Sequence, residues 1–237
     1  MKILALDSTA KVASVAICDS DKPLAEYNID NGLTQSELLL PMAEAAIKSL
    51  GIDLSDIDLF AVTVGPGSFT GVRIGVSLVK GLAFGKDKPC VAVSTLEALA
   101  ENASGLSGII LPCMDARRGE VYNAVFRSDK NGCVRLTEDR AISLAELAEE
   151  LESYKDEKIY LVGDGYAVAT KSLTEYGITL ENTPLLLCSQ NAVSVARVAY
   201  REYLSGKAVS ADELSPTYLR LPQAERERLE RQNANKS

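Results

Sequence analysis

The chain has 237 residues, 46% of them hydrophobic, and a formal net charge of −8, which suits one large or two modest globular domains. It contains no histidine, so it lacks the commonest general base and the commonest zinc ligand, which excludes Ser-His-Asp hydrolases, Cys-His hydrolases and HExxH metalloenzymes. Nucleic-acid binding needs a basic face that displaces counterions, so this acidic chain should bind RNA poorly unless a partner protein supplies that face.

The cysteine pattern and the hydropathy predict a cytoplasmic protein. Five cysteines are scattered without a CxxC pair, which favours reduced thiols over a disulfide framework. The N-terminal apolar run is broken at Asp7, and no uninterrupted apolar segment approaches the roughly 18 residues that a membrane span needs. We therefore expect no targeting signal and no membrane contact.

The N-terminal part of the chain predicts a hairpin followed by alternating helices and strands. An apolar strand ends at Asp7, and after a turn an alternating strand follows with Val15 and Ile17. The elements after it, in chain order, are a strand from Leu24 to Ile29, a helix from Gln35 to Leu50, a strand from Leu59 to Val64, a helix from Gly71 to Gly85 and a strand from Cys90 to Val93. This order is typical of an α/β protein.

Both predicted helices begin with a capping signal. The first begins with the capping box Thr34-x-x-Glu37, and Thr70 is the predicted N-cap of the second. Each glycine in a helix interior costs about 1 kcal/mol relative to alanine. The second helix nevertheless carries Gly71, Gly75, Gly81 and Gly85. Several glycines in one helix indicate that another backbone approaches it closely.

The stretch TVGPGSFTGVRIG, residues 63–75, has the look of a phosphate-binding loop because two glycines separate a strand from a helix. A Walker loop needs Gly-Lys-Ser/Thr, and no lysine follows before Lys80. A dinucleotide fingerprint needs its third glycine three residues after Gly67, and Gly71 comes one place late. We favour a tight turn shaped by Gly65 and Gly67 over phosphate binding.

The N-terminal segment has a counterpart later in the chain. Residues 3–22 resemble residues 111–130 at a constant offset, which pairs Asp7 with Asp115 and Ala16 with Ala124. The second copy continues with a strand from Val134 to Leu136, a helix from Leu144 to Leu151, and a segment from Tyr160 to Leu173 in which Gly163-Asp164-Gly165 matches Gly65-Pro66-Gly67. Such units also recur in unrelated α/β proteins.

The repeat predicts two ββ(β)αβα lobes with a boundary near Gly105 to Gly108. The expected first lobe is 1–105 and the expected second lobe is 106–221. Residues 222–237 are charged and nearly free of aliphatic side chains, so we expect a frayed helix or a disordered tail there.

Four separated motifs carry a resemblance to a known family: LALDSTAKVASVA, VGPGSFTGVRIG, MDARRGEVYNAVF and SPTYLR. From residue 2 to about Glu225 the chain closely resembles the TsaB family, also called YeaZ. That resemblance implies the α/β fold of the actin, sugar-kinase and Hsp70 superfamily, with two duplicated ribonuclease-H-like lobes, each a mixed sheet with helices.

The resemblance also implies a function. TsaB proteins are non-catalytic partners in making the threonylcarbamoyladenosine of tRNA next to the anticodon. Catalysis, with a histidine-bound metal and ATP chemistry, is expected on the paralogue TsaD and the ATPase TsaE, with no cofactor in this chain and tRNA bound only through the complex. Gln35 and Ser36 stand where the paralogue has its histidine pair, and both are poor metal ligands.

The first hairpin turn is the other candidate site. Asp7, Ser8 and Thr9 sit where a kinase of this superfamily would hold phosphates and metal, so they form a vestigial phosphate turn in this interpretation. Arg117 and Arg118 obstruct the matching second turn and are predicted to line the cleft between the lobes. The alternative function is a small-molecule kinase or acyl-phosphate enzyme that uses Asp7 as its metal-binding carboxylate.

The two first-lobe helices are apolar on more than one side, which predicts a docking surface for the paralogue and for a homodimer of the isolated chain. The predicted interface residues are Leu38, Leu39, Met42, Ala46, Val72, Gly75, Val76 and Val79. A charge at Val76 should then separate the dimer without unfolding the chain. The alternative is that these side chains are covered within the monomer.

Overall fold

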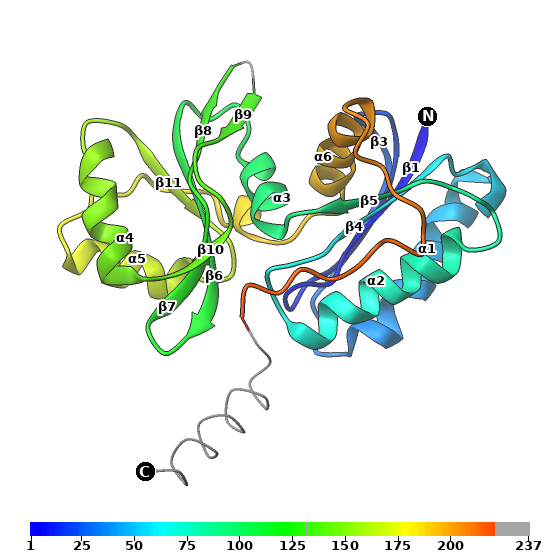
Figure 1. The fold of residues 1–237 in the computed structure, drawn as a ribbon, viewed down its shortest axis with the longest axis horizontal. Coiled ribbons are helices and arrows are strands. Elements are labelled where there is room, and N and C mark those ends of the chain that lie inside the picture. Colours follow the sequence, from blue (N-terminus) through cyan, green and yellow to red (C-terminus); the bar gives the residue numbers. More distant parts are fainter. Residues whose placement is uncertain (131, 221–237) are drawn as a thin grey trace, which may run out of the picture.

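The structure is a computed structural model that describes residues 1–130 and 132–220. These residues form two α/β lobes side by side, each built on its own sheet (Figure 1). The predicted two-lobed α/β architecture is therefore present. The tail predicted at 222–237 lies outside the described residues.

The first lobe is a five-stranded mixed sheet in the order β3-β2-β1-β4-β5. Its strands are β1 (Lys2–Asp7), β2 (Ala13–Asp19), β3 (Lys22–Ile29), β4 (Leu59–Thr63) and β5 (Cys90–Val93). The first three strands are antiparallel, whereas β4 pairs in parallel with β1 and β5. Both β1 and β4 are buried almost throughout, as expected for central strands with both faces covered.

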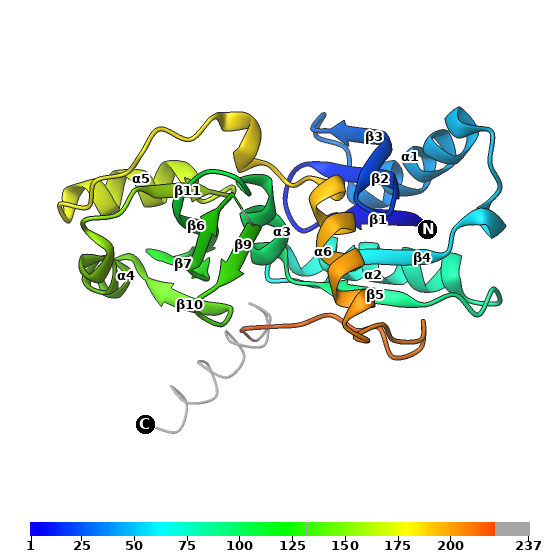
Figure 2. The same ribbon diagram turned by 90° about the horizontal axis from the view of Figure 1, so that it is seen from above.

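Three helices cover the two faces of this sheet (Figure 2). They are α1 (Gln35–Leu50) and α2 (Phe69–Ala83) on one face and α6 (Ala192–Leu204) on the other, and a short 3₁₀ helix, Leu54–Asp56, follows α1. Alternate residues of β1 divide between the two faces: Leu4 and Leu6 pack with α1 and α2, and Ile3 and Ala5 pack with α6.

The position of α6 corrects the predicted lobe boundaries, because residues 106–221 do not form one lobe. The chain crosses back after the second sheet, and α6 packs on β1, β2, β4 and β5. Small side chains make this packing close: Ala196 and Ala199 of α6 belong to the same buried cluster as Ala16 and Ala61 of the sheet. The segment after α6 also lies on the first lobe, where Leu214 is buried beside the α1 and α2 side chains.

The second sheet has the order β10-β7-β6-β8-β9, with β11 paired to β6. Its elements are β6 (Gly108–Arg117), β7 (Glu120–Asn123), β8 (Phe126–Asp129), β9 (Gly132–Arg135), β10 (Arg140–Ser143), α4 (Leu144–Leu151), a 3₁₀ helix at Glu152–Tyr154, β11 (Ile159–Val162), α5 (Tyr166–Glu175) and a 3₁₀ helix at Leu185–Cys188. β7 pairs with one half of β6 and β8 with the other. Pro112 lies between the halves and has no N–H to continue the ladder.

Helix α3 (Thr95–Asn102) lies between the two lobes (Figure 1). Its Leu96 and Leu99 pack with Met114 and Phe126 of the second sheet, while the same helix contacts α6 of the first lobe. The sequence analysis did not identify this helix, which joins the hydrophobic cores of the two lobes.

The helix starts agree with the sequence in one case and differ in the other. The capping box of α1 is present, with the Thr34 N–H donating to the Glu37 carboxylate at 2.8 Å. The N-cap of α2 is Ser68 rather than Thr70, because the Ser68 hydroxyl accepts from the Gly71 N–H at 3.2 Å.

In the described part of the chain no helix has the length and apolar content to cross a membrane.

Candidate functional site

A cavity of about 600 Å³ separates the two lobes. It is lined by the turn after β1, the turn between β4 and α2, the turn between β6 and β7, Asp164 after β11, and residues 217–220. All four motifs that carry the family resemblance therefore meet at this cleft. Its volume lies within the range of roughly 300–1,000 Å³ that is usual for small-molecule sites.

The first hairpin turn is stabilised by hydrogen bonds between its own residues. Asp7 is 1% exposed, and its carboxylate accepts from the Thr9 N–H at 2.9 Å and from the Thr9 hydroxyl at 2.6 Å. Burial raises the pKa of Asp7 to about 6, although the hydrogen bonds from Thr9 oppose that shift. The Thr9 N–H that a phosphate would need already serves Asp7, which is the arrangement of a capped turn.

The glycines of the second motif fit this turn against α2. The Ser68 N–H donates to the Thr9 carbonyl at 2.7 Å, and a Cβ on Gly67 would lie 2.5 Å from that same carbonyl oxygen. A Cβ on Gly71 would collide with the Ser8 carbonyl oxygen, and one on Gly75 with the Ser8 hydroxyl. The backbone that approaches α2 is thus the chain's own hairpin turn.

The two glycines near the other end of the helix have no such role. A Cβ added to Gly81 or to Gly85 would meet nothing within 4 Å. Gly81 lies on the exposed side of α2, and Gly85 lies beyond its last residue. The expected close approach therefore holds for the N-terminal half of the helix alone within the described structure.

The second hairpin turn has a strained backbone. Arg117 and Arg118 both have positive φ, at 65° and 57°, and the Arg117 N–H donates to the Asp115 carboxylate at 2.7 Å. Arg117 lines the cleft, as predicted, whereas Arg118 is not among the lining residues. An arginine thus occupies the corner where a phosphate-binding turn would need glycine.

The predicted interface residues are core residues. None of their seven non-glycine side chains is more than 7% exposed, and Gly75 is buried as well. Together they fill the space between the first sheet and its two covering helices: Leu38, Leu39, Met42, Ala46, Val72, Gly75, Val76 and Val79. The specific prediction of an exposed surface made by these side chains is wrong, because the sheet face formed by Leu4, Leu6 and Phe60 needs this cover.

Gln35 has a structural role at the position expected to match the paralogue's histidine pair. Its side-chain amide donates to the carbonyls of Ala10 and Lys11, at 2.9 and 3.3 Å, and so fastens α1 to the first hairpin. Ser36 is exposed. Among the residues that the structure describes, no group of three or more carboxylate or thiol side chains is arranged to hold a metal ion.

Comparison with known proteins decides the family. The chain is 33% identical over 222 residues to the tRNA threonylcarbamoyladenosine biosynthesis protein TsaB of Escherichia coli K12, covering 93% of this chain and 95% of the relative. It is 31% identical to the Bacillus subtilis TsaB, covering 98% of this chain and 100% of the relative. The chain belongs to the TsaB family.

The chain also matches a family model and a solved structure. The family model described as "TsaD: tRNA N6-adenosine threonylcarbamoyltransferase" matches residues 34–228, so this TsaB chain and that enzyme family share sequence over most of its length. The solved structure of YeaZ from Pseudomonas aeruginosa superposes with a TM-score of 0.77 at 26% identity, covering 92% of this chain and 99% of that one. The chain has the two-lobed actin-like fold predicted for it.

Proposed function

We propose that this chain is the non-catalytic partner subunit of a tRNA threonylcarbamoyltransferase. It would act with a TsaD-like catalytic paralogue and a TsaE-like ATPase to modify the adenosine next to the anticodon, in the cytoplasm. The observation that carries this proposal is similarity to proteins named TsaB over nearly the full length of both chains. The fold alone would not carry it, because this superfamily hosts many activities.

Three features support a role without catalysis. The chain has no histidine for a metal or a general base. Gln35 is committed to the backbone of the first hairpin. The Thr9 N–H and hydroxyl both donate to the Asp7 carboxylate, so this N–H is not free for a phosphate, and Asp7 itself does not line the cleft. ATP and metal would therefore be bound by the partners.

Reconstitution tests the function directly. The TsaD-like and TsaE-like proteins of the source genome would be incubated with unmodified tRNA, threonine, bicarbonate and ATP, together with the enzyme that makes threonylcarbamoyl-adenylate. The modified nucleoside would be quantified by mass spectrometry with and without this chain. We expect modification only when the chain is present with the TsaD-like protein. Equal modification without this chain, or modification by this chain in place of the TsaD-like protein, would refute the proposal.

The kinase alternative makes a separate prediction. A kinase that used Asp7 as a metal ligand would bind Mg-ATP with micromolar affinity in isolation, and calorimetry would detect that. We expect no such binding by the isolated chain. Asp7 does not line the cleft, and one of its carboxylate oxygens already accepts two hydrogen bonds from Thr9, which disfavours a metal-ligand role because a ligand carboxylate must face its ion.

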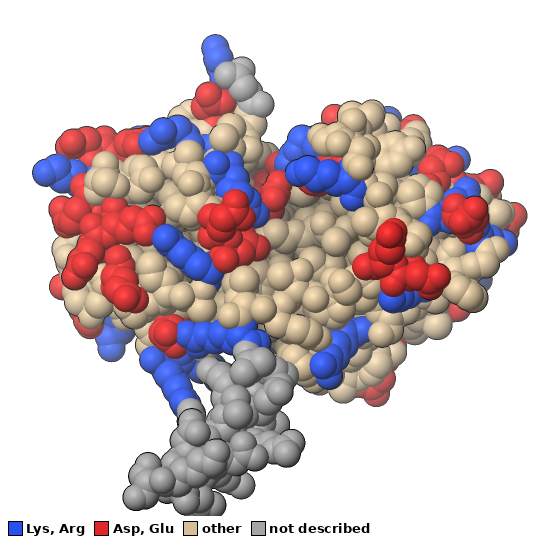
Figure 3. Space-filling model, viewed as in Figure 1, with Lys and Arg blue, Asp and Glu red and all other residues tan. Residues whose placement is uncertain are grey.

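The docking surface for the paralogue is proposed on the outward face of α2, which replaces the buried set predicted from the sequence. The two basic side chains of α2 are hydrogen-bonded to the C-terminal segment: Arg73 donates to the Tyr218 hydroxyl at 2.8 Å, and Lys80 donates to the Asp212 carbonyl at 3.0 Å. The other exposed or half-exposed residues of α2 are uncharged: Phe69, Thr70, Ile74, Ser77, Leu78, Gly81 and Leu82. Figure 3 shows an uncharged area across the centre of the molecule, bordered by charged side chains.

A groove of about 550 Å³ continues this surface beside α1, with Leu40, Ile47, Ile52 and Leu82 among its walls. The occupant we propose is the TsaD-like paralogue, because the TsaD family model matches this chain across α1 and α2 and the paralogue should present the same two helices. A surface that is matched to its own paralogue is also close to self-complementary, so the isolated chain should form a two-fold homodimer through it.

One pair of variants tests the surface. Gly81→Arg places a long side chain on an open, exposed position of α2 and should abolish both the homodimer and binding to the TsaD-like protein without loss of helicity. Val168→Arg is the matched control, since Val168 is 49% exposed on α5 of the other lobe. Light scattering and co-purification give the readout. A dimer that survives Gly81→Arg, or is lost with Val168→Arg, would move the interface elsewhere.

A further inference from the structure

The SPTYLR motif ends a C-terminal strap, residues Val209–Arg220, whose first part is firmly attached to the first lobe. Val209 and Cys90 exchange two backbone hydrogen bonds, at 2.8 and 2.9 Å. Leu214 is 1% exposed in the first-lobe core, and the Thr217 N–H donates to the Val64 carbonyl at 2.8 Å. Figures 1 and 2 show the strap, drawn in orange to red, running from the end of α6 along this lobe toward the second lobe.

The last residue of the strap reaches across the cleft. The Arg220 guanidinium forms an ion pair with Glu120 and donates to the Ala116 carbonyl at 3.4 Å. It also lies 6.0 Å from the centre of the Tyr122 ring. Ala116, Glu120 and Tyr122 all belong to the β6–β7 hairpin of the second lobe. Within the described residues, the Arg220 side chain fastens the strap to that lobe, whereas backbone pairing and the buried Leu214 fasten it to the first lobe.

The strap also contacts the outward side of α2 just before it crosses. Tyr218 accepts a hydrogen bond from Arg73 and stacks on Phe69, with ring centres 4.7 Å apart. Arg73 in turn lies over the Phe69 ring at 3.7 Å. Tyr218, which contacts α2, is therefore only two residues before Arg220, which contacts the second lobe. Residues 217–220 also form one wall of the cleft.

The chain crosses between the lobes on another side, near the end of α3. Asn102 donates to the carbonyls of Leu187 and Ser189, at 3.1 and 2.7 Å, which ties the outgoing crossing to the returning one. A rotation of one lobe against the other would have to be absorbed in these two crossings, which we therefore call the hinge.

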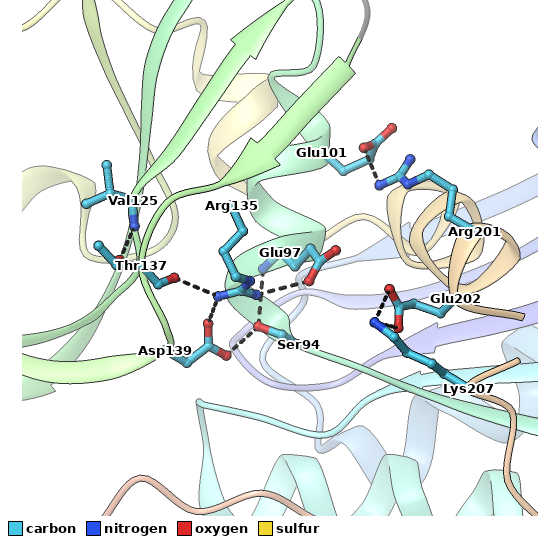
Figure 4. A network of polar contacts seen from close by, with 10 residues as sticks. All are labelled: Ser94, Glu97, Glu101, Val125, Arg135, Thr137, Asp139, Arg201, Glu202 and Lys207. Atoms are coloured by element: carbon cyan, nitrogen blue, oxygen red, sulfur yellow. Dashed lines mark hydrogen bonds and ion pairs between the residues drawn. The ribbon is translucent and has the colours of Figure 1, made fainter. Parts of the chain in front are cut away.

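Polar contacts brace the hinge side (Figure 4). The Ser94 hydroxyl, at the start of α3, donates to the Asp139 carboxylate at 2.5 Å. Arg135 of the second lobe bridges Asp139 and Glu97, at 2.5 and 3.0 Å. With the hinge side braced in this way, the opening of the cleft depends on what spans its other side, and the strap spans it.

We propose that the Val209–Arg220 strap is an inter-lobe latch that holds the cleft at one width, with the Arg220–Glu120 contact as its releasable end. Release would let the second lobe rotate about the hinge and would free Tyr218 to move relative to α2. The latch joins the cleft to the outward face of α2, so the two cannot change independently. This inference concerns the isolated chain and does not depend on the proposed tRNA function.

Distance measurement between the lobes tests the latch. Spin labels would be attached at Asp21→Cys in the first lobe and Ala145→Cys in the second, both exposed positions. Four native cysteines are buried, and burial raises the pKa of the fifth, Cys133, to about 12, so the engineered thiols should react first. In the unaltered background we expect one narrow distance distribution by pulsed electron paramagnetic resonance.

Arg220→Ala should broaden this distribution and shift its mean by more than the original width. Glu120→Ala removes the same ion pair from the other lobe and should reproduce the change, which keeps the test valid if Arg220→Ala does not fold. The matched control is Arg127→Ala, since the Arg127–Glu157 pair at 2.6 Å lies within the second lobe. A folded Arg220→Ala or Glu120→Ala protein with the original narrow distribution would overturn the latch, as would equal broadening in the control.

Discussion

The two faces of α2 show how one helix can use the same residue type in opposite ways. On its inward face Gly71 and Gly75 let the first hairpin turn approach so closely that no side chain would fit. On its outward face Gly81 borders open space, and Phe84, just past the helix end, is 71% exposed. The inward glycines are explained within the monomer, whereas Gly81 has no contact in the described structure that explains it.

The largest expected effect comes from a charge on the inward face. Val76 is 3% exposed between α2 and the first sheet, so Val76→Glu would bury an unpaired carboxylate at a cost of several kcal/mol. We expect an unfolded or aggregated protein, in contrast to the folded monomer that the sequence predicted. Far-UV circular dichroism and thermal melting would measure it.

Ser77→Glu is the control for that variant. Ser77 is the next residue along α2 and is exposed, so its glutamate should leave the melting temperature nearly unchanged. A folded Val76→Glu protein would show that the inward face is not the core that its burial indicates.

The next largest expected effect is the pH dependence of stability that comes from the Asp7 carboxylate. This carboxylate lies in the hairpin turn that packs against the inward face of α2. Burial raises its pKa from 3.8 to about 6, so between these values the folded state holds a proton that the unfolded state has lost. The free energy of unfolding should therefore fall as pH rises through that window, by about 3 kcal/mol for a shift of this size. Asp7→Asn mimics the protonated acid and should remove this pH dependence.

Chemical denaturation at pH 4 and at pH 7.5 would measure the difference. We expect Asp7→Asn to be more stable than the original protein at pH 7.5 and nearly equal to it at pH 4. An Asp7→Asn protein that is less stable at pH 7.5 would show that the carboxylate is stabilised by a charge partner in its ionised form. That result would revive the metal-ligand alternative.

Gly75→Ala tests the close packing on the inward face. Its methyl group would collide with the Ser8 hydroxyl, which also donates to the Gly71 carbonyl at 2.8 Å. Overpacking of this kind costs about 1–3 kcal/mol. We expect the Ser8→Ala, Gly75→Ala double variant to be more stable than the sum of the single changes predicts, as measured by a double-mutant cycle in urea. Simple additivity would mean that the two residues do not press on each other.

The sequence predicted elements well where a hydrophobic period and an end signal coincided. The bounds of α1, α4 and β5 match the prediction: the two helices have a helical period and begin with a capping box, and β5 is a short run of four apolar residues. The start of α2 was placed two residues late because Ser68 and Thr70 are both good caps. The short helix α3 and the alanine-rich α6 were missed, and α6 belongs to a lobe that its position in the chain does not indicate.

The sequence likewise predicted one part of the candidate site correctly and another part wrongly. The prediction from the repeated motifs that Arg117 lines the cleft agrees with the structure, and Thr9 of the matching first turn lines the same cleft, whereas Asp7 is buried behind it. Helical periodicity identified the apolar residues of α1 and α2 but not which of their sides faces the sheet. That assignment needs the pleat of β1 and β4, whose alternate residues require cover on both faces.

The smallest effect on stability is expected from Gly81→Ala. This variant tests whether the outward face of α2 serves a protein interface or the monomer. Alanine there meets nothing within 4 Å and replaces the poorest helix former after proline, so Gly81→Ala should raise the free energy of unfolding by up to about 1 kcal/mol. If the outward face packs closely against the paralogue's helices, the same methyl group should weaken that binding, measured by calorimetry with the TsaD-like protein. A gain in stability together with a loss of affinity identifies a glycine that serves the interface. A loss of stability would instead show that Gly81 serves the monomer, and the two faces of α2 would then differ less than their exposure indicates.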